Sequence, residues 1–354
     1  MLDRICTELI RALDGIEQFQ RRFYPPTLAS LQADLFPLMT SLKQAVADLE
    51  KHEIIGGLED VRDAVQGPAV LVVEALELIT SPSGSTMQEA VLRVMRAFRK
   101  CCRAQEQLFN KRRSHPCIQG FFLEPRARAR IKELDPETPP RADTGLHHSA
   151  ARGDPYARGL CSVYVPESYD GSEAWPLVVA LHGGFGHGRD FIWTWLREAR
   201  SRRFILMAPS SQGTTWSLLN PEVDGPVLRS LIETITRQWN IDRARILLTG
   251  ISDGATFALI NSFTRQSPFA AFAVVSGALA PGDYRMARGK RICWIHGSLD
   301  WMFPVTVAVR AAHLLEEAGA EITLRVIDDL SHTYPRDEND RILTWFDPSL
   351  SLSA

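Results

Sequence analysis

The sequence predicts an α/β domain with a mostly parallel sheet flanked by helices, preceded by an all-α helical bundle. Two observations support this prediction. Apolar residues recur every three or four positions through the first 110 residues, whereas short β-rich runs alternate with helical segments from about residue 155 onward. A stretch with several Pro and Gly residues, typical of a linker, lies between them. We therefore expect a helical N-terminal domain over 1–132, a linker over 133–154 and an α/β domain over 155–354.

Four amphipathic segments make up the predicted helical domain. They cover residues 5–16, 28–49, 58–79 and 87–109. Pro37 should kink or interrupt the second segment, and Pro68 should strain the third, because proline removes a backbone hydrogen bond. Ser85 and Gln88 have the spacing of a capping box at the start of the fourth. The short breaks between segments predict an antiparallel bundle.

Charge is distributed unevenly over this region. Residues 1–92 contain 7 basic and 14 acidic side chains, whereas residues 93–132 contain 12 basic and 2 acidic ones. A basic stripe of this kind could face an anionic lipid, a nucleic acid or an acidic partner. The simpler interpretation, which we favour, is that one helix complements acidic neighbours within the bundle.

The composition excludes several classes of protein. Hydrophobic residues make up 45% of the 354 residues and charged residues 23%, which is typical of globular domains and not of disordered or fibrous chains. The formal charge is −2, so we expect no nucleic-acid partner. The six cysteines are scattered and form no CxxC pair, which predicts free thiols without a disulfide framework, a bound metal or another cofactor.

The sequence shows no targeting or membrane-spanning pattern. Charges at Asp3, Arg4 and further positions interrupt the N-terminal segment, unlike the apolar core of a signal peptide. The longest apolar stretch, 68–78, contains Glu74 and Glu77 and is shorter than the roughly 20 residues that a transmembrane helix needs. We therefore expect a cytoplasmic protein without integral membrane association.

Seven β-rich runs follow the predicted linker. They are CSVYVP, PLVVALHGG, FILMAPS, RILLTGIS, AFAVVSG, RICWIHG and ITLRVID. Several are almost entirely apolar, as expected for strands buried on both faces. This pattern predicts a mostly parallel sheet with helices on both sides.

A G-x-S-x-G motif, GISDG over 250–254, lies between one of these runs and a helical segment. The glycines are needed because side chains on either side of a tight strand–turn–helix junction would clash with the strand and the helix. Such a turn projects a serine hydroxyl above the sheet. We therefore expect Ser252 to be a nucleophile.

A serine nucleophile needs a base, because its hydroxyl is almost never ionised at neutral pH. His332 follows the last predicted strand and Asp300 follows the preceding one, where parallel sheets place their functional sites. We expect His332 to be the base and Asp300 its carboxylate partner, with Asp329 as the weaker alternative. Of the other histidines, His187 is a candidate substrate contact, whereas His182 and His296 each begin an HG turn and are expected to brace loops.

The oxyanion that forms on nucleophilic attack needs preorganised N–H donors. One should be the backbone amide of Asp253, immediately after the nucleophile. The second should come from HGGFG over 182–186, where glycines let the backbone approach a substrate closely. Either Gly184 or Phe185 can supply it.

Four motifs give the chain a resemblance to a known family. They are LHGG at 181–184, GISDG at 250–254, HGSLDWMFPV at 296–305 and LSHTYP at 330–335. Between about residues 155 and 348 the chain resembles the α/β-hydrolase superfamily, particularly its small serine esterases of the phospholipase/carboxylesterase group. The resemblance implies that Gly184, Ser252, Asp300 and His332 supply the oxyanion loop, nucleophile, acid and base. The helical first 130 residues match nothing in that minimal family.

These observations predict a metal-independent serine carboxylesterase acting on a small-molecule ester. An amidase, a peptidase or a lysophospholipase could use the same residues, and a scaffold with a vestigial hydrolase domain is a further alternative. Trp216 and Trp301 follow predicted strands and could line an apolar acyl pocket together with His187. The segment 278–290 is too short to hold a cap domain. We expect the N-terminal bundle to act as a lid, to bind a partner or to form a homo-oligomer.

Overall fold

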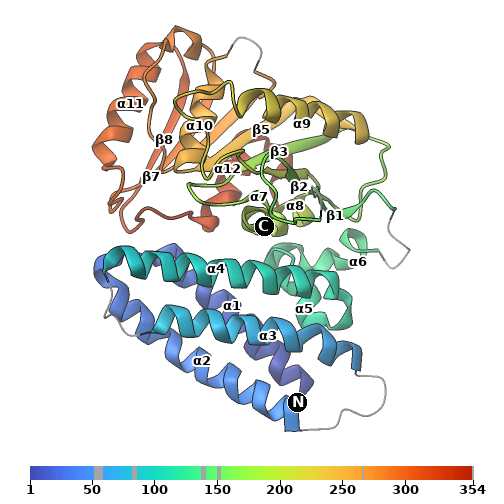
Figure 1. The fold of residues 1–354 in the computed structure, drawn as a ribbon. Coiled ribbons are helices and arrows are strands. Elements are labelled where there is room, and N and C mark those ends of the chain that lie inside the picture. Colours follow the sequence, from blue (N-terminus) through green and yellow to red (C-terminus); the bar gives the residue numbers. More distant parts are fainter. Residues whose placement is uncertain (52–58, 82–85, 137–140, 150–152, 265–266, 353–354) are drawn as a thin grey trace. The chain divides into compact units, whose positions relative to one another are not determined.

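The computed structural model describes residues 1–51, 59–81, 86–136, 141–149, 153–264 and 267–352. The chain divides into two compact units, Met1–Pro125 and Arg126–Ala354 (Figure 1). Among the described residues, no helix combines the length and the apolar character needed to cross a bilayer.

Four long helices form the N-terminal unit, which confirms the predicted helical bundle. They are α1 (Leu2–Arg22), α2 (Leu28–Lys51), α3 (Glu59–Thr80) and α4 (Met87–Asn110), followed by the short α5 (Pro116–Phe121). The predicted apolar stripe of α1 is buried from Ile5 to Ile16. Helix α1 packs along α2, and α3 packs along α4 (Figure 1). The unit therefore has its own apolar core.

The structure shows where the two prolines and the capping box of the bundle lie. Pro37 lies inside the continuous helix α2, and Pro68 lies inside the continuous helix α3, where it is buried. Burial of the apolar stripes offsets the lost hydrogen bonds, which cost about 3 kcal/mol per internal proline. The capping box of α4 is formed by Thr86 and Glu89, each of which accepts a hydrogen bond from the other's amide. The predicted Ser85 lies outside the described residues.

An eight-stranded sheet forms the centre of the C-terminal unit, with the order β1-β2-β4-β3-β5-β6-β7-β8. Its strands are β1 (Gly145–His148), β2 (Cys161–Val165), β3 (Trp175–Leu181), β4 (Ile205–Pro209), β5 (Ile241–Ile251), β6 (Ala271–Val275), β7 (Arg291–Gly297) and β8 (Glu321–Ile327). The β1–β2 and β2–β4 pairs are antiparallel and every other pair is parallel. The predicted mostly parallel sheet is confirmed.

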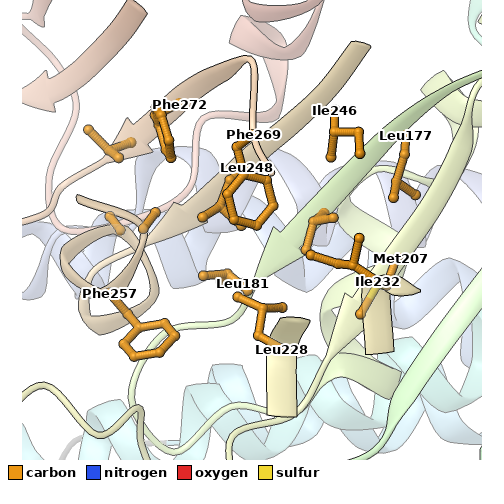
Figure 2. Packing of buried hydrophobic residues seen from close by; sticks show 14 of the residues in the cluster. Leu177, Leu181, Met207, Leu228, Ile232, Ile246, Leu248, Phe257, Phe269 and Phe272 are labelled. Carbon is orange, nitrogen blue, oxygen red and sulfur yellow. The ribbon is translucent and has the colours of Figure 1, made fainter. Parts of the chain in front are cut away.

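Helices cover both faces of this sheet. The helices of this unit are α6 (Ile131–Leu134), α7 (Gly188–Phe191), α8 (Leu196–Arg202), α9 (Gly225–Gln238), α10 (Asp253–Ser262), α11 (Val305–Glu317) and α12 (Asn339–Phe346). On one face, Leu177 and Leu181 of β3 pack with Ile232 of α9 and Phe257 of α10 (Figure 2). The alternate residue Val178, which points to the opposite face, is also fully buried. Burial on both faces explains the apolar runs in the sequence.

The range 133–154, expected to be a linker, contains structure that belongs to the C-terminal unit. Strand β1 pairs with β2 at the edge of the sheet. Its sequence, Gly-Leu-His-His, has neither β-branched residues nor a clear alternation, so nothing in it predicts a strand. Upstream of β1, Asp135 is buried in an ion pair with Arg200 of α8. The α/β unit therefore begins before residue 135.

This ion pair leads to a prediction about stability. The fully buried Arg200 guanidinium lies 2.5 Å from Asp135 Oδ2, and its Nε lies 3.2 Å from Glu167 Oε2. Asp135→Ala removes a carboxylate that is paired with a buried cation, so we expect the free energy of unfolding to fall by about 3 kcal/mol in urea denaturation. Asp143→Ala, which removes the more exposed pair with Arg141, should cost less than about 1 kcal/mol. Equal losses in the two variants would contradict this prediction.

Candidate active site

Ser252 occupies the sharp turn between β5 and α10. Its backbone has φ 55° and ψ −122°, a conformation that L-residues rarely adopt. A hydrogen bond to the neighbouring strand stabilises this strained conformation: the Ser252 amide donates to the Val275 carbonyl at the end of β6 at 3.0 Å. The residue is only 9% exposed. The turn thus fixes a serine hydroxyl at the carboxyl edge of the sheet.

The two glycines of the GISDG motif are required by their close neighbours. A Cβ on Gly250 would lie 2.7 Å from the Gly254 carbonyl carbon. A Cβ on Gly254 would lie 2.4 Å from the His182 carbonyl oxygen. Both neighbours are backbone atoms that cannot move aside, so no residue larger than glycine fits at either position.

The structure brings Ser252, His332 and Asp300 together. The Ser252 Oγ lies 2.9 Å from His332 Nε2. The other ring nitrogen of His332, Nδ1, lies 2.9 Å from Asp300 Oδ2 and 3.0 Å from Oδ1. With the proton on Nδ1, the imidazole donates to the carboxylate and leaves Nε2 free to accept the serine proton.

The Asp300 carboxylate is buried and receives several donors. Its Oδ1 accepts the amides of Met302 at 3.0 Å and Phe303 at 2.7 Å. Burial alone would raise the pKa of the Asp300 carboxyl, but His332, the Phe303 amide and His296 outweigh it and hold that pKa below its ordinary value. Asp300 is therefore held as an anion opposite the His332 ring.

The weaker alternative carboxylate, Asp329, lies elsewhere in the His332 loop. It is exposed, whereas Asp300 is 6% exposed and hydrogen-bonded to the His332 ring.

Neighbouring side chains fix the segment beyond His332. The Arg336 guanidinium pairs with Glu198 of α8 at 3.1 Å, and the Asn339 side-chain amide donates to the Thr194 carbonyl at 3.0 Å.

The loop after β3 contains the candidate oxyanion donors. The Phe185 amide donates to the Thr214 carbonyl at 2.9 Å, so it is already engaged. In the described part of the chain, the Gly184 amide donates to no acceptor. Asp253 is the first residue of α10, where amides have no partner within the helix. The geometry thus favours Gly184 over Phe185 as the partner of Asp253.

Residues 214–216, which precede α9, hold this loop and the turn together. The Thr214 carbonyl accepts from Phe185, as described above. The Thr215 hydroxyl donates to Asp253 Oδ2 at 2.5 Å, and the Trp216 indole donates to the His182 carbonyl at 2.8 Å. Thr215 was not predicted from the sequence, because no motif links it to a residue 38 positions away.

His182 braces the same loop, as expected. Its Nε2 accepts the Ser211 amide at 3.1 Å, and its Nδ1 lies 2.7 Å from the Gly183 carbonyl. These contacts fix the neutral tautomer with the proton on Nδ1. Burial lowers the pKa of His182 to about 3, so the ring stays uncharged at neutral pH.

The three residues predicted to contact substrate occupy different environments. Trp216 is 3% exposed and stacks on Phe257 in the core, so it supports the loop and does not line an open pocket. His187 is buried and caps α7 through the Arg189 amide, and its role as a substrate contact stays a prediction. Trp301 is 41% exposed with its ring centroid 6.3 Å from that of His332, so it is a solvent-accessible aromatic side chain beside that histidine.

The side chain of Phe185 is an exposed apolar group beside the site, which the sequence does not predict. Phe185 has φ 59° and is 65% exposed. Its backbone conformation turns the side chain outward from a loop that otherwise consists of glycine and histidine. The printed sequence gives no signal for this orientation, because it depends on the hydrogen bond to Thr214.

Part of the C-terminal unit, including Ser252, Asp300 and His332, matches a known protein family. Residues 225–347, which include Ser252, Asp300 and His332, match the Phospholipase/Carboxylesterase family. A probable feruloyl esterase C from Aspergillus terreus is 26% identical over 156 residues, covering 42% of this chain and 57% of that protein.

Solved esterase structures are also similar to this chain. A thermostable esterase has a TM-score of 0.47 and 21% identity, covering 53% of this chain and 58% of its own. Esterase PE8 has a TM-score of 0.43 and 25% identity, and the match covers 49% of this chain and 93% of PE8. An acetyl xylan esterase from Aspergillus awamori has a TM-score of 0.46 and 16% identity, and the match covers 57% of this chain and 98% of that esterase. This chain thus spans less than two thirds of the feruloyl esterase and of the thermostable esterase.

Proposed function

Because the C-terminal half of this chain carries an α/β-hydrolase domain of the phospholipase/carboxylesterase type, we propose that it is a serine carboxylesterase. The observation that carries the proposal is the hydrogen-bonded series from Asp300 through His332 to Ser252. Asp300 orients the imidazole, His332 is the general base and Ser252 is the nucleophile. The strained turn at Ser252 supports this role, because such strain is concentrated at functional sites.

The reaction proceeds in two steps through a covalent intermediate. The Ser252 oxygen attacks the acyl carbonyl carbon while His332 Nε2 takes the serine proton. The amides of Gly184 and Asp253 stabilise the negative charge that develops on the carbonyl oxygen. His332 then donates its proton to the departing alcohol, which leaves an acyl group on Ser252. Water, activated by His332, releases the acid and restores the serine.

The same groups could cleave an amide, since His332 can protonate an amine leaving group as well as an alcohol. Ester hydrolysis is favoured by the family match and by the esterase named among the relatives. A non-catalytic scaffold is disfavoured, because it would have no need for a strained serine bonded to a buried His–Asp pair.

A substrate panel on the full-length chain tests this proposal. It comprises p-nitrophenyl esters of increasing acyl length, a lysophospholipid, a peptide p-nitroanilide and, because one relative is a probable feruloyl esterase, methyl ferulate. We expect turnover of the p-nitrophenyl esters and slower or no turnover of the anilide. Turnover of the anilide alone would favour an amidase, and a folded protein inert to every substrate would favour the scaffold.

The Asp253 carboxylate leads to a second prediction. It lies beside the proposed oxyanion donors, since a Cβ on Gly184 would be 2.9 Å from Asp253 Oδ2. A negative charge there opposes the developing oxyanion. Asp253→Asn keeps an oxygen that can accept from Thr215 but removes the charge, so kcat for a neutral ester should rise roughly threefold to tenfold. The exposed Glu222→Gln on the same unit is the control and should leave kcat unchanged. A fall in kcat for Asp253→Asn would contradict this prediction.

A further inference from the structure

His296 lies at the end of β7, four residues before Asp300, and its side chain is completely buried. The Trp294 indole Nε1 lies 3.4 Å from His296 Nδ1. On the other side of the ring, His296 Nε2 lies 2.8 Å from the Phe303 carbonyl oxygen and 3.5 Å from Asp300 Oδ2. The imidazole therefore sits between the strand and the loop that carries Asp300.

These contacts determine where the His296 proton lies. An indole nitrogen only donates hydrogen bonds, so His296 Nδ1 must accept from Trp294. The proton of the neutral ring is then on Nε2, where it faces the Phe303 carbonyl and, at greater distance, the Asp300 carboxylate. Both are acceptors, and each favours this tautomer over the other.

The backbone of Phe303 connects His296 to the proposed triad. Its carbonyl accepts from His296, while its amide donates to Asp300 Oδ1 at 2.7 Å. Its ring packs edge-on to the His332 ring, with the centroids 5.3 Å apart. A shift of the Phe303 backbone would therefore displace both the Asp300 carboxylate and the ring that packs against His332.

We propose that His296 is a positioning residue for Asp300: as a neutral Nε2–H donor it closes the 300–303 loop and fixes the carboxylate opposite His332. The proposal rests on the esterase function proposed above. The competing interpretation is that His296 only fills space in the core. The two differ in what a substitution changes, because core filling affects stability alone, whereas positioning affects the chemical step.

The test uses two substitutions in the full-length protein. His296→Gln retains an N–H donor near the Nε2 position and an oxygen that can accept from Trp294. His296→Leu fills similar space without either group. Ile232→Ala, a buried residue of α9 on the same unit, controls for loss of stability. For each variant, kcat, KM and the pH profile are measured with p-nitrophenyl acetate, together with the melting temperature.

We expect His296→Leu to lower kcat roughly a hundredfold with KM little changed, because a misplacement of about 1 Å can cost that much. We expect His296→Gln to recover most of that loss. The titratable groups acting on Asp300 are His332 and His296. A displaced Asp300 stabilises the His332 imidazolium less, so the acid limb of the kcat profile should move to lower pH in His296→Leu. Ile232→Ala should lower the melting temperature without either kinetic effect.

Three results would overturn the proposal. They are a His296→Leu kcat equal to that of Ile232→Ala, a Gln variant no better than the Leu variant, and an acid limb that stays in place or moves to higher pH. Proton NMR distinguishes a wrong role for His296 from a wrong esterase proposal, because the NMR measurement needs no substrate turnover. The downfield signal of His332 Nδ1–H, identified by its absence in His332→Gln, should weaken in His296→Leu and persist in His296→Gln.

Discussion

Ser252→Ala should reduce kcat for p-nitrophenyl acetate by roughly 10⁶ while leaving the fold intact. The loss is this large because the nucleophile, base and acid act as a unit, so removing one member removes the covalent route. Residual turnover above the rate in water would come from the amides of Gly184 and Asp253. Steady-state kinetics measures the change, and circular dichroism with thermal melting shows whether the fold persists.

Ser276 provides a matched control for this substitution. It is also a buried serine with a positive φ, 48°, and it lies at the end of the adjacent strand β6. Ser276→Ala should therefore have a similar effect on the backbone but keep near-normal kcat. Comparable losses in the two variants would show that the turn geometry, and not the Ser252 hydroxyl, determines the rate.

Asp300→Asn should lower kcat by roughly 10⁴, if the precedent of serine proteases applies. The amide cannot accept the His332 Nδ1 proton with two oxygens as the carboxylate does, and its NH₂ group favours the tautomer with the proton on Nε2. That tautomer cannot accept the serine proton. The exposed Asp329→Asn is the control and should retain activity. The reverse result would make Asp329 the acid.

The Asp300 carboxylate should also make the stability of the wild-type protein depend on pH. The pKa of Asp300 is lower in the folded protein than its ordinary value, so its ionised form stabilises the fold above about pH 4. This contribution is lost as the pH falls through the folded pKa. Wild type should therefore lose more stability than Asp300→Asn on acidification below about pH 4, measured by urea denaturation. An identical loss in the two proteins would mean that Asp300 is not stabilised as an anion.

Much of the fold could be predicted because buried elements have recognisable patterns of apolar residues in the sequence. The central strands are buried on both faces and therefore appear as continuous apolar runs, as in the LVVAL run of β3. Strand β1 gives no such signal, because its edge position leaves its residues only partly buried. The prolines of α2 and α3 do not interrupt their helices, since packing in the bundle outweighs their local cost.

The site could be predicted in part for a similar reason. Ser252, Asp300 and His332 each follow a parallel strand, and the carboxyl ends of such strands meet at one edge. Their catalytic roles stay predictions. The engagement of the Phe185 amide and the contact of Thr215 with Asp253 depend on how a distant loop folds back. Short sequence motifs carry no information about such contacts. The role of the N-terminal unit as a lid or an oligomerisation element also stays a prediction.

The most direct test of the account is to identify the acyl-enzyme. Full-length protein is mixed rapidly with excess p-nitrophenyl acetate, quenched in acid, digested and analysed by mass spectrometry. We expect a burst of about one p-nitrophenolate per chain, and an acetyl group on the peptide that contains Ser252, absent from Ser252→Ala. Turnover with the acetyl group on another residue, or turnover that persists in Ser252→Ala, would contradict it.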